Sequence, residues 1–135
     1  SALKRANLAA EEIHSDLDQK SREQFLKDFR NNKTNILVAT DILSRGIDID
    51  DIDLVINYDV PNDGEDYIHR IGRTARAATS GTAFTLISEK EQGKFSDIEA
   101  LLGGPVLKGI VPDEFGPTPP YIPKQKRRGY FNKRR

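Results

Sequence analysis

The sequence predicts an α/β fold with a mostly parallel sheet and helices on both of its faces. Three nearly continuous apolar runs of strand length occur at residues 35–40, 54–58 and 82–87. Runs of this kind are typical of strands that are buried on both faces of a parallel sheet. Helical patterns separate them, and strands that alternate with helices imply βαβ units. With 135 residues, the chain is expected to hold at most one domain.

The elements before the first apolar run are predicted from spacing and capping. Residues 1–10 have the pattern of the end of a helix without a capping start, so the chain is expected to begin inside an element. Residues 11–14 are a short strand candidate. Asp18 is expected to cap a helix over residues 19–31. The buried stripe of that helix would consist of Phe25, Leu26 and Phe29.

The octamer HRIGRTAR, residues 69–76, follows a helix start at residues 61–66. If the helix continues through the octamer, at about 100° per residue, four residues fall within an arc of roughly 100°. These are His69, Gly72, Arg73 and Arg76. The opposite, core-facing side would carry Ile68, Ile71 and Ala75. Two guanidiniums on one face offer fork-shaped donors that phosphate oxygens accept in pairs. The alternative is a solvated basic face that pairs with surface acids.

The last predicted helix begins at a capping box formed by Ser88 and Glu91, runs to Leu102 and ends before Gly103. Prolines then exclude a further helix or central strand. We therefore expect a domain over residues 1–112, an extended Pro-rich linker over residues 113–123 and a basic, disordered tail over residues 124–135.

The charge is distributed unevenly along the chain. Residues 1–123 carry 14 Lys and Arg against 21 Asp and Glu, whereas residues 124–135 carry seven Lys and Arg and no acid. A basic arm on an acidic body favours nucleic-acid binding, although such an arm can also be a solubilising end. The chain has no cysteine, no long apolar run and no pattern of a signal peptide. These features predict a soluble, intracellular protein without disulfides or thiolate chemistry.

Polar loops follow three of the predicted strands. They begin after His14, Thr40 and Tyr58. Because the carboxyl ends of parallel strands meet at the same edge of a sheet, these loops are expected to share a site there.

Two segments of the chain resemble two signature motifs of DEAD-box RNA helicases. The first runs from Ala39, Thr40 and Asp41 to Arg45, Gly46, Ile47 and Asp48, and the second is HRIGRTAR, about twenty residues later. Both belong to the second RecA-like domain of that family. Gln19 and Arg22 resemble a third motif, and the basic tail is similar to the arms of bacterial RhlE-type members. The resemblance covers about residues 1–105 and implies a RecA-like fold.

The resemblance also implies roles for individual residues. The RNA backbone would contact Gln19, Arg22 and Thr40, and the tail residues Lys126, Arg127 and Arg128 would add phosphate contacts. Nucleotide binding would involve Gly46 and Asp48, with Arg73 and Arg76 as catalytic arginine fingers on the γ-phosphate of ATP. Coupling between domains would use Arg45 and His69.

The chain departs from the family pattern at two points. Ala75 stands where the family usually has glycine, which would lengthen the helix or strain it. The chain also lacks the phosphate-loop motif, the D-E-A-D run and the opening strand. We therefore expect a partial domain with half of an active site. ATP and magnesium would be held mainly by an absent N-terminal RecA-like domain, and the whole protein would act in the cytoplasm on single-stranded RNA or short duplexes.

Other functions have weaker support in the sequence. A calcium loop at residues 48–59 would need glycine at Asp53 and glutamate at Asp59, so no metal site is expected. A non-catalytic RNA-binding module that relies on the basic tail is the main alternative, and a DNA translocase of the same superfamily is a third.

Overall fold

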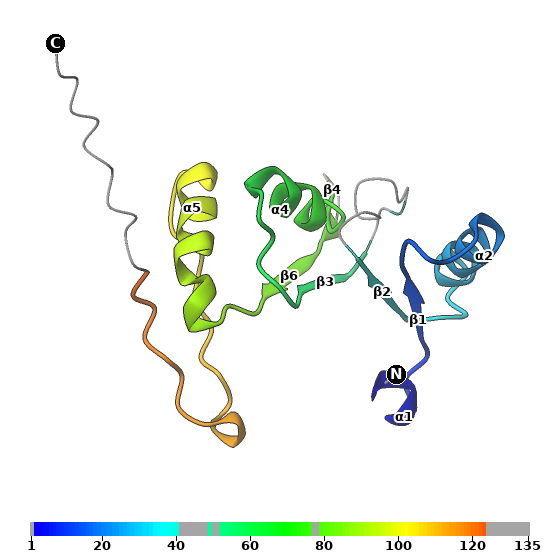
Figure 1. Ribbon diagram of the computed structural model, residues 1–135, viewed down its shortest axis with the longest axis horizontal. Coiled ribbons are helices and arrows are strands. Elements are labelled where there is room, and N and C mark those ends of the chain that lie inside the picture. The colour runs from blue at the N-terminus through cyan, green and yellow to red at the C-terminus, as the bar shows by residue number, and fades with distance from the viewer. Residues whose placement is uncertain (1, 41–48, 50–51, 77–78, 124–135) are drawn as a thin grey trace, which may run out of the picture.

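The computed structural model describes residues 2–40, 49, 52–76 and 79–123 (Figure 1). Its first part contains a short helix α1 (Ala2–Arg5), strand β1 (Ala10–Ile13), helix α2 (Gln19–Arg30) and strand β2 (Ile36–Ala39). The two strands pair in parallel, with Ile13 opposite Ala39. The ladder extends one residue further, because the Thr40 N–H donates to the Ile13 carbonyl (3.3 Å). The predicted crossover from strand through helix to parallel strand is confirmed.

The first predicted helix is wrong in its extent. α1 ends at Arg5, and Asn7 adopts a left-handed φ of 61°, which closes the helix. The Leu8 N–H then donates to the Leu3 carbonyl (3.1 Å). Ala10, predicted to be helical, is a buried residue of β1. Asparagine tolerates this backbone conformation better than most residues, so the local stop signal is Asn7.

α2 begins and ends close to the predicted positions. Asp18 caps it, with its Oδ1 accepting a hydrogen bond from the Ser21 N–H (2.8 Å). The predicted buried stripe is only half-buried at Phe25, Leu26 and Phe29, and none of the described α2 residues is fully buried.

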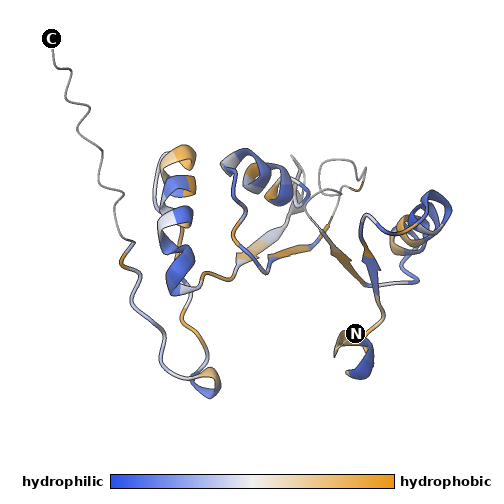
Figure 2. Cartoon of the chain, in the orientation of Figure 1, coloured by the Kyte–Doolittle hydropathy of each residue, from blue (hydrophilic) through white to orange (hydrophobic). Residues whose placement is uncertain are grey.

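The remaining strands form two further pairs. β3 (Leu54–Asn57) pairs in parallel with β6 (Thr82–Thr85), and β4 (Ala75–Arg76) pairs antiparallel with β5 (Thr79–Ser80). The mostly parallel arrangement is confirmed. Strands β3 and β6 carry hydrophobic residues (Figure 2). Full burial of both strand faces is wrong, because the side chains of Ile56 and Phe84 are 59% and 58% exposed.

Helix α4 (Gly64–Ile71) lies over the β3–β6 pair and is shorter than predicted (Figure 1). Asp63 caps its start by accepting from the Glu65 N–H (2.9 Å). Tyr67 is the buried residue of this helix, whereas Ile68, predicted to face the core, is exposed. The core-facing side therefore passes through Tyr67 and Ile71, which are four residues apart.

The main core lies between α4 and helix α5 (Gln92–Leu102), which follows the 3-10 turn η1 (Glu89–Glu91). It is built from Val60, Tyr67, Phe95 and Ile98. The predicted capping box is present, since Glu91 Oε2 accepts from both the Ser88 N–H (3.2 Å) and the Ser88 hydroxyl (2.6 Å). α5 ends as predicted at Gly103, whose φ of 83° is left-handed.

The segment after α5 includes a second 3-10 turn, η2 (Asp113–Phe115), and returns along α5. It contributes Val106 and Tyr121 to the edge of the core. The domain boundaries placed at residues 112 and 123 stay predictions. Among the described residues, no helix has the length and apolarity needed to cross a membrane.

Candidate functional site

The octamer at residues 69–76 spans three kinds of backbone in place of one helix. His69, Arg70 and Ile71 end α4, with His69 exposed. Gly72 follows as the C-cap, with its N–H donating to the Ile68 carbonyl (2.9 Å). The prediction of a helix through Arg76 is therefore wrong, because Ala75 and Arg76 form β4. Of the two effects considered for Ala75, lengthening of the helix does not occur.

The helix stops at Gly72 because its last carbonyl groups find other partners. The Thr74 hydroxyl donates to the Ile71 carbonyl (3.0 Å), and Thr74 is buried. A Cβ atom added at Gly72 would lie 3.0 Å from the Ile68 carbonyl oxygen, which is tighter than most contacts of this kind. A side chain at this position would crowd the last turn, so glycine suits the exit from the helix.

The backbone of Arg73 is held on both sides. Its N–H donates to the Arg70 carbonyl (3.3 Å), and its own carbonyl accepts from the Ile52 N–H (3.3 Å). The second contact joins the octamer to the segment that leads into β3. Arg73 is half-buried, and its side chain extends from a turn that tertiary hydrogen bonds fix in place.

Gly81, the residue before β6, brings a second part of the chain against this turn. A Cβ atom at Gly81 would lie 2.5 Å from the Thr74 carbonyl oxygen and 2.9 Å from the Thr74 Cα. Both are backbone atoms that a rotamer change cannot move away. The close approach of Gly81 therefore helps to set the position of the peptide that follows Arg73.

Arg70 has a structural role that the sequence analysis missed. Its Nη1 donates to Asn57 Oδ1 (3.1 Å) and to the Asp59 carbonyl (3.3 Å) at the end of β3. Burial lowers the pKa of the Arg70 guanidinium. A signal for this role is its spacing of three residues from Tyr67, which places both on neighbouring positions of one helix side.

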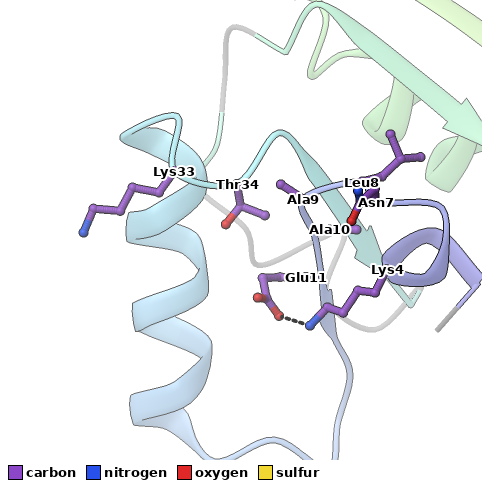
Figure 3. Close-up of a pocket in the computed structure, with 8 residues that line it drawn as sticks. All are labelled: Lys4, Asn7, Leu8, Ala9, Ala10, Glu11, Lys33 and Thr34. Carbon is purple, nitrogen blue, oxygen red and sulfur yellow. Dashed lines mark hydrogen bonds and ion pairs between the residues drawn. The ribbon is translucent and has the colours of Figure 1, made fainter.

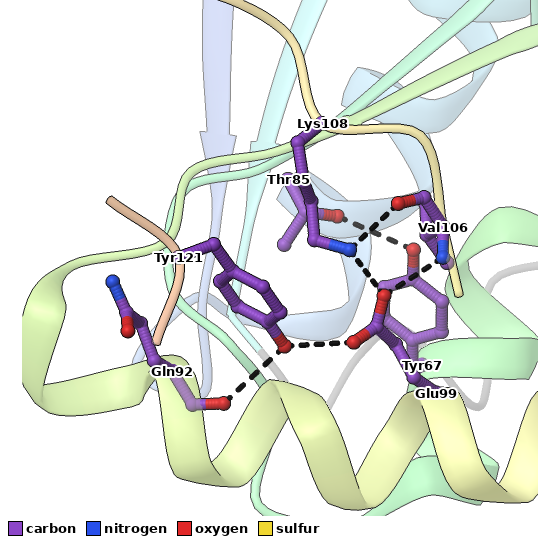
Figure 4. A network of polar contacts seen from close by, with 7 residues as sticks. All are labelled: Tyr67, Thr85, Gln92, Glu99, Val106, Lys108 and Tyr121. Atoms are coloured by element: carbon purple, nitrogen blue, oxygen red, sulfur yellow. Dashed lines mark hydrogen bonds and ion pairs between the residues drawn. The ribbon is translucent and has the colours of Figure 1, made fainter. Parts of the chain in front are cut away.

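The Asn57 side chain extends this contact into a network across three elements. Asn57 is 2% exposed, and its Nδ2 donates to Thr85 Oγ1 (3.3 Å) on β6. Thr85 Oγ1 lies 3.5 Å from the Tyr67 hydroxyl on α4, a contact visible in Figure 4. The network ties α4, and with it the octamer, to the carboxyl ends of β3 and β6.

Three predicted RNA-contacting residues lie at the carboxyl ends of β1 and β2. Thr40 is exposed directly after β2, and Gln19 and Arg22 occupy the first turn of α2, which follows β1. Arg22 Nη2 donates to the Leu17 carbonyl (3.3 Å), and Nη1 lies 3.5 Å from Gln19 Oε1. The Arg22 Nε atom is buried and has no hydrogen-bond partner among the described residues.

The Asp18 carboxylate binds the first turn of α2. Asp18 accepts from the Ser21 N–H and from the Ser21 hydroxyl (2.9 Å). Both bonds lower the pKa of Asp18 below its usual value, and the bond from the Ser21 backbone N–H has the larger effect. The ionised carboxylate also complements the positive end of the helix dipole.

The polar loops are predicted to lie together at one edge of one sheet, but the described residues do not form such a sheet. The β1–β2 pair and the β3–β6 pair are separate two-stranded sheets in the described part of the chain. Gln19, Arg22 and Thr40 belong to the first, whereas Arg70 and Arg73 follow the second. Other predicted site residues lie outside the described residues: Arg45, Gly46, Asp48, Lys126, Arg127, Arg128 and the side chain of Arg76.

A pocket with a polar lining lies between α1, β1 and the turn after α2 (Figure 3). Lys4 and Glu11 form an ion pair there (3.1 Å). Ala10 and Glu11 at the start of β1 line it, as do Lys33 and Thr34, which precede β2, so it lies near the amino ends of these strands. It includes none of the predicted site residues.

Comparison with known proteins identifies the domain. The helicase conserved C-terminal domain matches residues 1–78, more than half of the chain. The chain belongs to this family.

Relatives of this helicase C-terminal domain include the ATP-dependent rRNA helicase RRP3 of Encephalitozoon cuniculi, which is 48% identical over 101 residues. The match covers 75% of this chain and 25% of RRP3, so the chain spans about a quarter of the length of that relative. The solved structure of the E. coli DEAD-box protein SrmB, bound to regulator of ribonuclease activity A, is 35% identical with a TM-score of 0.73. It covers 93% of this chain and 69% of the SrmB chain.

A variant of S. cerevisiae Dbp5 bound to RNA and ADP BeF3 is 34% identical, with a TM-score of 0.69 over 76% of this chain and 28% of the Dbp5 chain. These similarities confirm the RecA-like fold class. They also establish that the relatives of this helicase C-terminal domain are DEAD-box RNA helicases.

Proposed function

We propose that this domain is the second RecA-like domain of an ATP-dependent RNA helicase, which binds the RNA backbone and supplies arginine fingers to ATP held by an N-terminal domain. The observation that carries the proposal is the pair of ordered motifs, residues 39–48 and 69–76, inside the segment that matches the family. RRP3 is an ATP-dependent rRNA helicase, and the Dbp5 structure contains RNA and ADP BeF3, which supports the same function here.

RNA binding is assigned to Gln19, Arg22 and Thr40. Their grouping at the carboxyl ends of β1 and β2, with the Arg22 guanidinium already oriented by Leu17, supports this assignment. Contacts to phosphates and 2′-hydroxyls carry no base identity, so binding is independent of sequence. Single-stranded RNA and short duplexes fit such contacts. The tail residues Lys126, Arg127 and Arg128 would add salt-dependent affinity.

ATP contacts are assigned to Arg73 and Arg76, with Gly46 and Asp48 on the ribose side. Arg73 fits the role because its peptide groups are fixed by hydrogen bonds on both sides, which limits the ordering that phosphate binding requires. An arginine finger stabilises charge that develops on the transferred phosphoryl group and contributes about 10³–10⁵ in rate. This chain would thus hold half of the active site.

Magnesium that accompanies ATP neutralises charge on the phosphate oxygens. We assign magnesium and most of the ATP contacts to the N-terminal domain. Arg45 and His69 would couple the RNA and nucleotide sites. We also place the protein in the RhlE-type bacterial group, on the strength of the basic tail, and in the cytoplasm, on the strength of a sequence without cysteine or a signal-peptide pattern.

The test is RNA-stimulated ATP hydrolysis by the longer helicase that contains this domain. Arg73→Ala is expected to lower kcat by about 10³ or more while RNA affinity without nucleotide stays the same. Arg22→Ala is expected to weaken RNA binding. Arg5→Ala, in the exposed α1, is the matched control and should change neither. Unchanged turnover in Arg73→Ala would remove the finger assignment.

A second candidate is a non-catalytic RNA-binding module. The observation that favours it is the tail, which holds seven basic residues and no acid. Deleting Lys124–Arg135 discriminates the two functions. A tail-driven module would lose nearly all RNA affinity and show no RNA-stimulated hydrolysis, whereas the helicase would lose affinity and keep part of its stimulated hydrolysis.

A further inference from the structure

The carboxyl end of β3 carries a buried side-chain amide whose orientation is fixed by its partners. Asn57 is 2% exposed, and its Oδ1 accepts a hydrogen bond from Arg70 Nη1 on α4 (3.1 Å). On the other side, Asn57 Nδ2 donates to Thr85 Oγ1 on β6 (3.3 Å). Because a guanidinium has donors and no acceptor, the amide atom that faces Arg70 has to be the oxygen. The nitrogen therefore faces the Thr85 hydroxyl, which can accept.

The Arg70 guanidinium is half-buried, so it needs acceptors from the protein in place of water. Its Nη1 also donates to the Asp59 carbonyl (3.3 Å), two residues beyond Asn57 on the chain. Burial lowers the pKa of Arg70, because the charged form loses part of its hydration. Asn57 Oδ1 is thus a side-chain acceptor that holds a partly desolvated cation against the end of β3.

The main chain of Arg70 continues this link to Arg73. The Arg70 carbonyl accepts from the Arg73 N–H (3.3 Å). The carbonyl of Arg73 is fixed separately, by the Ile52 N–H (3.3 Å), so Arg70 holds the amino side of this residue. Arg70 is therefore fastened to β3 by its side chain and to Arg73 by its backbone. Two hydrogen bonds and one residue connect the buried amide of Asn57 to the peptide group of Arg73.

We propose that Asn57 is a positioning residue for the arginine finger. Its side-chain oxygen fixes Arg70, and Arg70 fixes the peptide group from which the Arg73 side chain extends. Asn57 itself touches no substrate and acts through Arg70. This inference rests on the proposed function, because it requires that Arg73 contacts the γ-phosphate of ATP.

The physical basis is preorganisation of the finger. A guanidinium stabilises the transferred phosphoryl group only where charge develops in the transition state, and a displacement of about 1 Å can cost about 100-fold in rate. Loss of an interaction that is made only in the transition state lowers kcat and leaves KM unchanged. The proposed RNA contacts, Gln19, Arg22 and Thr40, belong to the other strand pair. RNA affinity without nucleotide should therefore not depend on Asn57.

The experiment uses the longer helicase that contains this domain. It measures kcat and KM for ATP at saturating RNA, RNA affinity without nucleotide, and the free energy of unfolding. Asn57→Leu keeps roughly the volume of the side chain and removes both polar atoms, whereas Asn57→Asp keeps an oxygen that faces Arg70. Gln92→Leu is the matched control on α5. Gln92 is also a buried amide with hydrogen bonds at both of its polar atoms, to Pro120 and Ile122, and it lies outside the octamer and β3.

Asn57→Leu is expected to lower kcat about 10- to 100-fold, with KM for ATP and RNA affinity within about twofold of the parent. Asn57→Asp should restore most of kcat, because its carboxylate still accepts from Arg70. Gln92→Leu should lower the free energy of unfolding and leave kcat unchanged, which separates positioning from a general loss of stability. Unchanged kcat in Asn57→Leu, or an equal fall in Asn57→Leu and Asn57→Asp, would overturn the proposal.

A double-mutant cycle with Arg70→Met tests the route. If Asn57 acts through Arg70, the double variant should lose no more kcat than Arg70→Met alone, whereas independent losses that multiply would overturn the proposal. Should Asn57→Leu not fold, Arg70→Met removes the same hydrogen bond from the other side and has to lower kcat at unchanged KM. Arg73→Ala distinguishes the two levels of failure. Unchanged turnover in Arg73→Ala removes the finger itself, whereas a fall in Arg73→Ala without one in Asn57→Leu removes this inference alone.

Discussion

Gly81→Ala tests whether the turn after α4 is fixed by close backbone packing. The new Cβ would lie 2.5 Å from the Thr74 carbonyl oxygen and 2.9 Å from the Thr74 Cα. Real Cβ atoms almost never approach another heavy atom within 3.0 Å. Because both neighbours are backbone atoms, relief requires β6 or the turn at Thr74 to move.

Overpacking of a well-packed site costs about 1–3 kcal/mol, and backbone neighbours place this substitution at the upper end, about 3 kcal/mol. For a chain of this size, that corresponds to a fall in Tm of about 10 °C. Thr74 directly follows Arg73, so the same movement displaces the proposed arginine finger. A displacement of about 1 Å can lower catalysis about 100-fold, which is the loss of kcat we expect in the longer helicase.

Urea denaturation followed by circular dichroism measures the free energy of unfolding, and RNA-stimulated ATP hydrolysis measures the second effect. The matched control is Gly109→Ala, because a Cβ at Gly109 would meet no atom within 4 Å. That variant is expected to stay within about 0.5 kcal/mol of the parent. If Gly81→Ala were as stable as Gly109→Ala, the close approach of β6 to Thr74 would not constrain the turn, and the reasoning would be refuted.

Three further predictions concern the polar contacts around the core. Arg70→Met removes hydrogen bonds to Asn57 and Asp59 and leaves the buried Asn57 side-chain oxygen without its donor. The free energy of unfolding, measured by urea denaturation, should therefore fall by about 2–3 kcal/mol, and a fall below about 0.5 kcal/mol would contradict a stabilising role of these bonds. A chain that ends at Pro112 lacks the Tyr121 contacts with the core, and its free energy of unfolding should fall by about 2–4 kcal/mol. An unchanged melting curve would show that residues 113–123 do not stabilise the domain. Burial raises the pKa of Tyr121 above 10.0, so the stability that its neutral hydroxyl contributes is complete below pH 10 and is lost as the pH rises through the higher pKa of the folded state. Ultraviolet absorbance of tyrosinate checks this, since Tyr121→Phe should remove the last tyrosine to titrate.

Local signals in the sequence were sufficient for α2, α5 and the parallel strands and for several of their ends, whereas β4 and β5 were not predicted. The cap at Asp18, the capping box between Ser88 and Glu91 and the left-handed stop at Gly103 all depend on residues within one turn of the chain. The apolar runs identified β2, β3 and β6 for the same reason. Nearby residues decide these features, so a pattern of a few positions predicts them.

For the octamer at residues 69–76, residue spacing alone predicted a continuous helix, which is wrong. A helix through residues 69–76 is consistent with periodicity, and Gly72 is the only local sign of a stop. What ends the helix is partly remote: Ile52 holds the Arg73 carbonyl, and Gly81 packs against Thr74. The structural role of Arg70 depends in the same way on Asn57, thirteen residues earlier. Contacts between residues far apart in the chain do not produce a periodic pattern in the sequence, so residue spacing does not predict them.

By itself, the sequence determined the fold class, the family motifs and the chemistry available at the site, because these depend on residue identity and on short spacing. The tertiary structure decided which arginine is structural, where the motif helix ends and how residues 105–123 are fastened to α5. Each of those outcomes is set by hydrogen bonds and packing between separate elements, and the free energy of such contacts exists only once the elements have been brought together.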